Sequence, residues 1–239
     1  MKKQVAGIIN AGGKGSRLYP ITLEIPKPLL TIGRKPIIQY QVELFRKHKL
    51  NPIYVSVNKD DLPLFEKWKV EYKNTDVKFV VEKERLGTWG GIRKFMSAQK
   101  YEGTFLISNG DELKEFDLSK LIALHEKAKA LITVAAITVK NPHDYSVLEI
   151  EKGGKIKGWE YKPRNPKTHL AHVGTHVVDS SLLKLLQKEK IISFEEQIIP
   201  LVLKQGKVYA RKMEGRWHDC GTFERYEQAI YDWTGKTRL

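Results

Sequence analysis

The sequence predicts an α/β protein with a three-layer α/β/α arrangement around a mixed, mainly parallel central sheet and a smaller antiparallel part. In the first half, short β-branched runs alternate with amphipathic helical stretches, as the βαβ units of a parallel sheet require. In the second half, strands follow one another through short turns, which is typical of antiparallel pairing. The chain has 239 residues and is 41% hydrophobic, so it can bury a substantial core. A Rossmann-like fold is therefore expected.

Four strands and three helices alternate in the first half. Residues 4–9 form an apolar run and predict a buried first strand. Residues 35–49 have helical spacing, with Pro36 expected in the first turn, where its missing N–H costs nothing. Thr88 is expected to cap a helix at residues 88–98. The other expected elements of this half are strands at residues 53–57, 78–81 and 104–108 and a helix at residues 62–71. Because strands and helices alternate throughout, a doubly wound sheet is predicted.

The second half is more antiparallel. It opens with a helix at residues 118–130 and a strand at residues 131–139. The turn Lys152-Gly153-Gly154 separates strands at residues 146–151 and 155–161, so a hairpin is expected. Further strands are predicted at residues 171–178 and 208–213, and helices at residues 181–189, 194–205 and 222–233. No internal repeat or linker divides the sequence, so we expect one domain over residues 1–239.

Charge and cysteine content limit the classes of function. Lysine and arginine (42) exceed aspartate and glutamate (28), but the basic residues are scattered and form no block. This pattern favours a solvated basic surface or anionic small substrates over a nucleic-acid interface. A single cysteine, Cys220, excludes an intramolecular disulfide and a four-cysteine zinc site. No apolar run is long enough for a membrane span or a signal peptide, so a cytoplasmic protein is expected.

A glycine-rich, basic loop follows the first strand, in the order Asn10-Ala11-Gly12-Gly13-Lys14-Gly15-Ser16-Arg17-Leu18. Three glycines within four residues let the backbone approach a ligand and turn its N–H groups towards an anion. Lys14, Arg17 and Lys27 add positive charge. The Walker and dinucleotide-binding loops are excluded, because Lys14 stands between glycines and Leu18 replaces a third glycine. A phosphate-binding loop is predicted, although the glycines alone would also fit an ordinary turn.

Residues 12–18, together with Pro20, Thr22 and residues 26–29, closely resemble the signature of the sugar-1-phosphate nucleotidyltransferases. The resemblance implies that Arg17 contacts the outer phosphates and Lys27 the reacting phosphate. It covers the catalytic domain only, from Val5 to Tyr231, so no appended C-terminal β-helix is expected. It also implies that the loop holds the nucleotide, through Ala11, Gly12, Gly13, Lys14, Gly15 and Ser16.

Two aspartates are candidate ligands for magnesium, which the attack of one phosphate on another is expected to use. Asp111 directly follows the fourth predicted strand, at the sheet edge where open α/β sheets bind ligands. Asp219 lies in residues 217–222, which resemble the family's late Trp-x-Asp-x-Gly-Thr element. The resemblance implies metal ligands at both aspartates and a nucleotide contact at Asn109. An ordinary turn at Asp111 and a helix cap at Asp219 are the alternatives.

Residues 82–88 resemble the family segment that reads the nucleobase. The resemblance implies that Glu82 reads the base and that Gly87 and Thr88 contact the nucleotide. A carboxylate only accepts hydrogen bonds, which suits the ring N–H of guanine, uracil or thymine and disfavours cytosine and adenine. An exposed glutamate at a strand end is the alternative. Trp89 replaces the family's usual small residue. Core packing is its expected role, and the alternatives are that its ring narrows the pocket or stacks on a substrate ring.

Residues 159–163 resemble the family's Glu-Lys-Pro element, in which glutamate binds the sugar and lysine binds its phosphate. Lys162 keeps the lysine's place. Tyr161 stands where the glutamate is expected, so either Glu160 binds the sugar through a register change or the sugar is held differently. Residues 173–176 resemble the next sugar-contacting element, with His176 replacing an aromatic residue. The implied sugar contacts are Glu160, Tyr161, Gly174 and His176.

Together the motifs predict an enzyme that transfers a nucleotidyl group from a nucleoside triphosphate, GTP or UTP/dTTP, to a sugar 1-phosphate. The expected mechanism is a single in-line displacement assisted by Mg²⁺, in which Arg17, Lys27 and Lys162 neutralise phosphates. Residues 1–130 are expected to bind the nucleotide. Residues 131–239 are expected to bind the sugar phosphate and to supply the second metal ligand.

Two other functions stay open at this stage. One is a cytidylyltransferase that acts on phosphocholine or a polyol phosphate, although Glu82 counts against cytosine. The other is a non-catalytic relative that binds nucleotides or nucleic acid. The presence of Arg17, Lys27 and both aspartates argues against this alternative, because a non-catalytic relative need not retain them. The triphosphate and sugar 1-phosphate are the expected partners. No membrane or nucleic-acid partner is expected, and the sequence leaves a homo-oligomer open.

Overall fold

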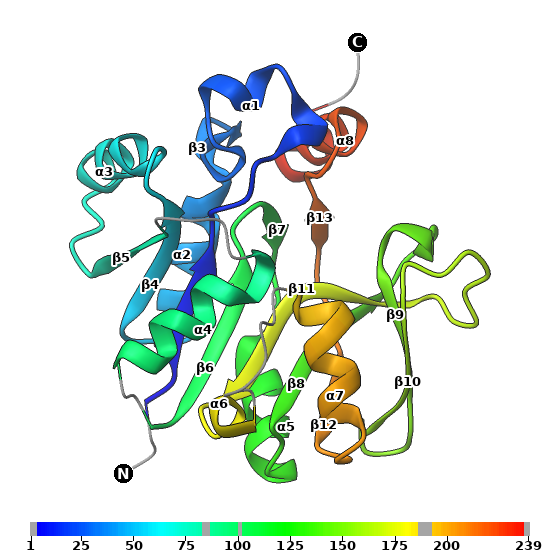
Figure 1. Cartoon of the computed structure of the whole chain (residues 1–239). Helices are drawn as coiled ribbons and strands as arrows, with labels where there is room; N and C mark the ends of the chain where they lie inside the picture. Colours follow the sequence, from blue (N-terminus) through cyan, green and yellow to red (C-terminus); the bar gives the residue numbers. More distant parts are fainter. Residues whose placement is uncertain (1–3, 83–86, 100–101, 186–192, 237–239) are drawn as a thin grey trace. The chain divides into compact units, whose positions relative to one another are not determined.

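The computed structural model describes residues 4–82, 87–99, 102–185 and 193–236 (Figure 1). Two compact units divide the chain, and each is built from several segments. Unit 1 comprises Met1–Val5, Leu86–Ile107 and Asp117–Glu214, and unit 2 comprises Ala6–Arg85, Ser108–Phe116 and Gly215–Leu239. The chain therefore crosses between the units more than once, and the predicted division at residue 130 stays a prediction.

Unit 2 is built on three parallel strands, β1 (Ala6–Asn10), β4 (Ile53–Asn58) and β5 (Val77–Glu82). Their β-branched residues are mostly buried, as a parallel sheet covered by helices requires. The covering helices are α2 (Ile37–Lys47) and α3 (Leu62–Glu71). Gly7 allows α2 to pack closely, because a Cβ atom there would lie 2.4 Å from Cδ2 of Phe45.

Short elements of unit 2 bring distant segments together. Strand β7 (Glu112–Lys114) pairs antiparallel with β13 (Trp217–Asp219), and β2 (Thr31–Ile32) pairs with β3 (Lys35–Pro36). The α8 helix (Phe223–Thr234) follows β13 (Figure 1). A buried cluster that includes Leu18, Leu113 and Cys220 packs these pieces together. The remaining short helices of this unit are η1 (Ser16–Leu18), α1 (Ile21–Glu24) and η2 (Lys27–Leu29).

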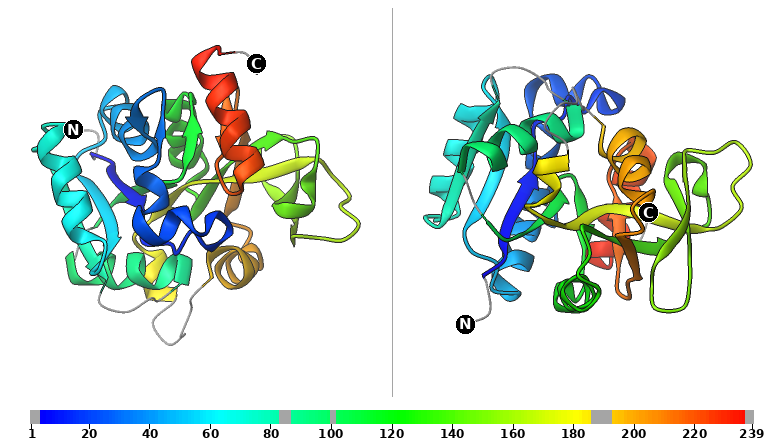
Figure 2. Two further views of the ribbon diagram at one scale, coloured as in Figure 1. Left: turned by 90° about the horizontal axis from the view of Figure 1, so that it is seen from above. Right: turned by 60° about the horizontal axis from the view of Figure 1, so that its bottom comes forward.

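Five strands of the described chain lie wholly in unit 1: β8 (Ile132–Thr138), β9 (Ser146–Ile150), β10 (Ile156–Tyr161), β11 (Leu170–Asp179) and β12 (Val208–Lys212). Their order is β10-β9-β11-β8-β12, and they are antiparallel except for the β8–β12 pair. The α5 and α7 helices cover opposite faces of these strands (Figure 2). The β6 strand (Thr104–Asn109) begins in this unit and ends in unit 2. The helices are α4 (Gly87–Gln99), α5 (Leu118–Ala128), η3 (Pro142–Asp144), α6 (Leu182–Leu185), η4 (Phe194–Ile198) and α7 (Ile199–Leu203).

The predicted strands and helices are present, with corrections at their ends. The helix expected at residues 35–49 begins at Ile37, because Lys35 and Pro36 pair with β2; Pro36 precedes the first turn instead of lying in it. Thr88 does not precede its helix, since the described α4 begins at Gly87. Of the helix predicted at residues 181–189, the part beyond residue 185 lies outside the described residues. Within the described ranges, none of the helices is long and apolar enough to cross a membrane.

Candidate functional site

The glycine-rich loop of unit 2 follows β1. Its middle is accessible, and its C-terminal end is held by hydrogen bonds. Ala11 is buried and its N–H donates to the Ser56 carbonyl oxygen at 2.8 Å. At Gly13, no other atom lies within 4 Å of the position of a Cβ. Gly15 has a left-handed φ of 63°, and the Thr22 hydroxyl donates to its carbonyl oxygen at 2.8 Å. The backbone around Gly13 is therefore accessible to an anion, while Thr22 holds the loop's end in place.

Arg17 and Lys27 occupy different environments beside this loop. Arg17 is exposed, and its Nη2 atom lies 3.1 Å from the position a Cβ would take at Gly221. Lys27 is only 5% exposed and lies in η2. The fold thus places Arg17 beside the segment that carries Asp219, over two hundred positions away in the numbering. The Lys14 and Ser16 side chains are exposed.

The charged cluster of unit 2 consists of Lys27, Asp111, Asp219 and Arg225. The Lys27 Nζ atom lies 2.5 Å from Oδ2 of Asp111 and 4.0 Å from Oδ1 of Asp219. The Nη1 atom of Arg225 donates to Oδ2 of Asp219 at 2.8 Å. The Asp111 side chain is 33% exposed and that of Asp219 is 14% exposed. The two predicted metal ligands therefore converge on one cationic group at an accessible position.

The electrostatics of the cluster keep its central pair ionised. Burial alone would lower the pKa of Lys27, but the charge and hydrogen bond of Asp111, aided by Asp219, outweigh burial and raise it. Burial would likewise raise the pKa of Asp111, but the charge and hydrogen bond of Lys27 lower it. Lys27 is therefore a protonated ammonium and Asp111 an ionised carboxylate at neutral pH.

The backbone explains why Asp111 lies at this place. Gly110 follows β6, and its N–H donates to the Asn10 carbonyl oxygen at 2.9 Å. A Cβ at Gly110 would lie 3.0 Å from Cγ2 of Ile9 and 3.1 Å from the same carbonyl oxygen. A larger residue would push this turn away from β1. The Asn109-Gly110-Asp111 turn is thus packed against the strand that leads into the glycine-rich loop.

Asp219 lies in the β13 strand, opposite Glu112 of β7. Helix capping, its alternative role, belongs to another residue, because Thr222 is the N-cap of α8 and its hydroxyl accepts from the Arg225 N–H at 3.3 Å. The Asp219 carboxylate instead faces Lys27 and Arg225.

A second buried network lies beside the charged cluster and was not predicted from the sequence. Glu112 is 6% exposed and accepts hydrogen bonds from Nδ2 of Asn109 and Nε1 of Trp217, both at 2.8 Å. Its carboxylate also lies 3.1 Å from Nζ of Lys114, which is 3% exposed. Burial raises the pKa of Glu112 more than the charge of Lys114 lowers it. These contacts fix the β7–β13 pair, and hence the backbone that carries Asp111 and Asp219.

Glu82 ends β5 and lies beside the glycine-rich loop. Its Oε1 atom accepts a hydrogen bond from the Ser56 hydroxyl and lies 3.6 Å from the position of a Cβ at Gly12. Glu82 is half-buried, so it is more than an exposed glutamate at a strand end. Its position next to the loop fits the predicted base-reading role.

The other predicted site residues lie in unit 1. Gly87 and Thr88 begin α4, and the Thr88 hydroxyl accepts from the Phe194 N–H at 3.1 Å. Trp89 is fully buried, and its ring lies 5.3 Å from that of Phe194 and 6.2 Å from that of His176. Core packing is therefore confirmed as the role of Trp89.

Unit 1 contains an aromatic cluster in which His176 packs with other rings. Its members are Trp89, Trp159, His172, His176 and Phe194. The His176 ring stacks on Phe194 at 3.8 Å with a 14° tilt, and His172 lies 5.7 Å from His176. Gly174, with a left-handed φ of 51°, lies where the register of β11 shifts between the two histidines. Such a shift redirects side chains along a strand. Gly174 thus helps to bring both histidines into one cluster.

The predicted sugar residues of β10 point to different faces. Trp159 and Tyr161 share one face of the strand and Glu160 points to the other, because side chains alternate. Glu160 lies 3.5 Å from Nζ of Lys167, whereas Lys162 Nζ lies 5.2 Å from the centre of the Tyr161 ring. Trp159 packs against His172 at 5.6 Å. Tyr161 therefore shares its face of β10 with a member of the aromatic cluster, and Glu160 does not.

Asp111 and Asp219 are a small donor set for a metal. Among the residues that the structure describes, no group of three or more histidines, cysteines or carboxylates is arranged to hold a metal ion. Two hard oxygen donors nevertheless suit magnesium, which takes one or two protein carboxylates and completes its shell with water and phosphate oxygens. Their convergence on the Lys27 ammonium shows that the position favours a cation.

Comparisons with known proteins agree on one class of protein. The model of a family described as nucleotidyl transferase matches residues 6–235. Mannose-1-phosphate guanyltransferases from Saccharomyces cerevisiae and Yarrowia lipolytica are 28% and 30% identical to the chain, over 90% of its length. The bifunctional protein GlmU of Methanocaldococcus jannaschii is 32% identical, also over 90% of the chain. The resemblance seen in the sequence is therefore confirmed.

The chain spans only part of these relatives, 61% and 60% of the two guanyltransferases and 50% of the GlmU protein. A solved structure from Bacillus anthracis, provisionally described as a glucose-1-phosphate thymidylyltransferase in complex with a sucrose, matches with a TM-score of 0.86. The match covers 98% of this chain and 97% of that one, at 24% identity. This likeness shows the fold and confirms the predicted mixed, mainly parallel sheet with helices on both sides.

Proposed function

Because the chain belongs to the nucleotidyl transferase family, we propose that it transfers a nucleotidyl group from a nucleoside triphosphate to a sugar 1-phosphate and releases pyrophosphate. The observation that carries this proposal is the position of Lys27 between two carboxylates, 2.5 Å from Asp111 and 4.0 Å from Asp219, beside an accessible glycine-rich loop. A structural ion pair would need only one carboxylate and no such loop.

The residues of unit 2 have separate tasks in this reaction. The open backbone around Gly13 supports binding of the triphosphate. Lys27 stays protonated, because its pKa is raised, and it offers a charged donor to the reacting α-phosphate. Exposed Arg17 offers a forked donor to the outer phosphates. The attacking sugar phosphate is already ionised, so positioning and charge neutralisation supply the catalysis.

Magnesium is the proposed cofactor, held by Asp111 and Asp219. When bound there, it would offset the negative charge that develops on the leaving pyrophosphate. Arg225 keeps the Asp219 carboxylate oriented through its 2.8 Å hydrogen bond, and Lys27 does the same for Asp111. The single cysteine, Cys220, is buried and supports the expected reducing cytoplasm.

GTP is the first choice of nucleotide, with UTP or dTTP as the other choices. One Glu82 oxygen already accepts from Ser56, and its carboxylate lies beside Gly12 of the loop. Guanine presents a ring N–H and an amino group to a carboxylate, whereas uracil and thymine present one donor between two carbonyl oxygens. Several relatives are named mannose-1-phosphate guanyltransferase, which supports the same choice.

The sugar 1-phosphate is proposed to bind in unit 1. Lys162 would neutralise its phosphate, and Tyr161 would contact the sugar in place of the family's glutamate. This preference over Glu160 rests on the strand face, since Tyr161 shares its face with Trp159. Gly174 would support the sugar indirectly by placing His176 in the aromatic cluster.

The test is a matrix of five nucleoside triphosphates against several sugar 1-phosphates, scored by pyrophosphate release with magnesium present. The expected result is turnover with GTP and mannose or glucose 1-phosphate, and little or none with CTP or ATP. Pyrophosphate release without a sugar phosphate would indicate hydrolysis of the triphosphate. No pyrophosphate release with any pair of substrates would overturn the proposed activity. Adding phosphocholine and a polyol phosphate to the matrix tests the cytidylyltransferase alternative directly.

A further inference from the structure

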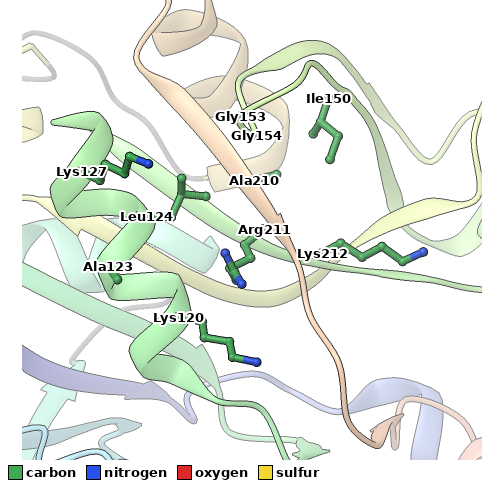
Figure 3. A pocket seen from close by; sticks show the side chains of 10 residues that line it. All are labelled: Lys120, Ala123, Leu124, Lys127, Ile150, Gly153, Gly154, Ala210, Arg211 and Lys212. Carbon is green, nitrogen blue, oxygen red and sulfur yellow. The ribbon is translucent and has the colours of Figure 1, made fainter.

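A basic pocket lies in unit 1, between one face of α5, the turn of the β9–β10 hairpin and the β12 strand. Figure 3 shows its lining, with one row of side chains along the helix and another on the strand. Its volume is about 660 Å³, within the roughly 300 to 1,000 Å³ typical of small-molecule sites. The lining residues are Lys120, Ala123, Leu124, Lys127, Ile150, Gly153, Gly154, Ala210, Arg211 and Lys212.

Four of these residues are basic and none is acidic. Among the described residues, Lys127, Arg211 and Lys212 form no ion pair within 4.0 Å, and Lys120 has only a 3.8 Å contact with the exposed Glu214. Like charges gathered in a concave surface repel one another and concentrate counter-ions. Asp117 and Glu214 line an adjoining recess together with Lys120, Arg211 and Lys212, and an anion that enters this pocket would add to their effect in offsetting the repulsion.

The helix residues that line the pocket have the spacing of a single face. Counted from Lys120, they lie three, four and seven positions along the helix, at Ala123, Leu124 and Lys127. A lysine therefore stands at each end of the row, with small or apolar residues between. Arg211 lies on the neighbouring strand (Figure 3). A guanidinium that shares a pocket with lysine ammonium groups is suited to a phosphate, because its fork binds two oxygens at once.

The apolar floor of the pocket is fixed by the hairpin turn. Gly154 has a φ of 87°, and a Cβ there would lie 2.6 Å from the Ala210 carbonyl oxygen and 3.3 Å from Cδ2 of Leu124. The Ala210 N–H donates to the Gly154 carbonyl oxygen at 2.7 Å. The turn is therefore packed closely against β12, and Leu124 and Ile150 belong to the apolar lining of the pocket. Such a floor can accept a planar or apolar part of a ligand.

We propose that this pocket is a second ligand site, which binds a small phosphorylated molecule carrying a planar or apolar group, such as a nucleoside monophosphate. None of its residues belongs to the motifs assigned to the transferase reaction, and all of them lie in unit 1. The phosphate would bind Arg211 and Lys120, and the planar group would lie on Leu124 and Ile150. The proposal does not depend on the proposed activity.

A small molecule fits this pocket better than a nucleic acid does. A groove for a polymer tracks its backbone with an extended row of cations and offers stacking aromatic rings. This pocket has neither, because its cations surround a hollow with an aliphatic floor and no aromatic side chain lines it.

The experiment uses ¹⁵N-labelled protein titrated with uridine 5′-monophosphate at fixed ionic strength. The Gly153 and Gly154 amide signals report on this pocket, and those of Gly12 and Gly13 report separately on the glycine-rich loop. Saturable shifts of Gly153 and Gly154 are expected. The double variant K120Q/R211Q should bind at least tenfold more weakly at these two signals, since it loses both proposed phosphate donors.

The control is the double variant K184Q/K204Q, which removes the same charge from exposed lysines of unit 1 and should bind like the wild type. Inorganic phosphate should bind more weakly than the nucleotide, and uridine should not shift these signals. The proposal is overturned if Gly153 and Gly154 do not shift, if both double variants bind alike, or if uridine binds as well as its phosphate. Tighter binding of a short DNA duplex than of the nucleotide would assign the pocket to nucleic acid instead.

Discussion

The charged cluster of unit 2 and the aromatic cluster of unit 1 both contain buried polar side chains, but they are built in opposite ways. Lys27 and Asp111 are held as full charges, each shifted towards its ionised form by the other. His172 and His176 are 5% exposed each and pack among the rings of Trp89, Trp159 and Phe194. From this contrast we propose a division of labour, in which the charged cluster of unit 2 handles the charge of the triphosphate and the aromatic cluster of unit 1 contacts the uncharged ring of the sugar.

The largest effect should come from the charged cluster. Asp111→Asn removes one charged metal ligand and the partner of Lys27, and we expect pyrophosphate release to fall by about 1,000-fold, comparable to the loss of a strong electrostatic contact to the transition state. The measurement is the turnover rate at saturating magnesium. The matched control is Asp60→Asn, an exposed aspartate of the same unit, which should keep the wild-type rate. Near-normal turnover of Asp111→Asn would refute the metal assignment.

A pH effect on stability should come from unit 1, through His125. This residue is 3% exposed, its Nδ1 atom lies 3.0 Å from the Thr133 hydroxyl, and burial lowers its pKa to about 4, with Asp179 opposing. The unfolded chain takes up the proton near pH 6.5 and the folded chain only near pH 4. The free energy of unfolding therefore falls as the pH falls through this window, by about 2 kcal/mol between pH 7 and pH 5.

His125→Gln should remove most of this pH dependence, as measured by urea unfolding at both pH values. His143→Gln, at an exposed histidine of the same unit, should retain it. An equal slope in wild type and His125→Gln would show that the buried imidazole is not the group that titrates. The result would distinguish the buried neutral His125 of unit 1 from the buried Lys27–Asp111 charge pair of unit 2.

A smaller effect should follow when the aromatic cluster is changed. His176→Phe keeps a ring that can stack on Phe194 but removes the polar edge. We expect the KM for the sugar 1-phosphate to rise about tenfold, which corresponds to one lost polar contact of about 1.4 kcal/mol, while the KM for the triphosphate stays within about twofold. Steady-state kinetics with each substrate varied in turn provide the measurement. A matching rise in both constants would contradict the division of labour.

The smallest effect should come from the network behind the charged cluster. Trp217→Phe removes the 2.8 Å hydrogen bond to buried Glu112 and keeps most of the ring packing. A loss of about 1 kcal/mol in the free energy of unfolding is expected, as for a single hydrogen bond to a buried group. Chemical denaturation measures it, with Trp233→Phe, at a half-buried tryptophan of the same unit, as control. No change would mean that Glu112 is held by Asn109 and Lys114 alone.

Three members of the charged cluster, Lys27, Asp111 and Asp219, could be predicted because they stand in short motifs, whereas Arg225 was not predicted. Lys27 lies between two prolines and Asp219 in a Trp-His-Asp-Cys-Gly-Thr run, so the local pattern is informative without the fold. The Glu112–Trp217 contact joins residues 105 positions apart through two three-residue strands, which are too short to leave a periodic pattern. The only sequence signal for this contact is the acidic residue directly after Asp111, which is Glu112.

The errors at helix ends have a similar origin. Pro36 fits the first turn of a helix by its own chemistry, but pairing with β2 takes it into a strand. The Thr88 hydroxyl is a good cap in isolation, but it accepts from Phe194, 106 positions later. In both cases a long-range hydrogen bond decides the outcome, which local propensity does not contain. The aromatic cluster was missed for the same reason, since its members come from separate strands and helices.

The most direct test of the division of labour is the binding of Mn²⁺, as a substitute for magnesium, in the presence of a non-hydrolysable triphosphate, followed by electron paramagnetic resonance. Asp111→Asn should weaken Mn²⁺ binding at least tenfold, whereas His176→Phe should bind it like the wild type. Wild-type binding by Asp111→Asn, or an equal loss in His176→Phe, would contradict the claim that the charged cluster, and not the aromatic cluster, holds the metal.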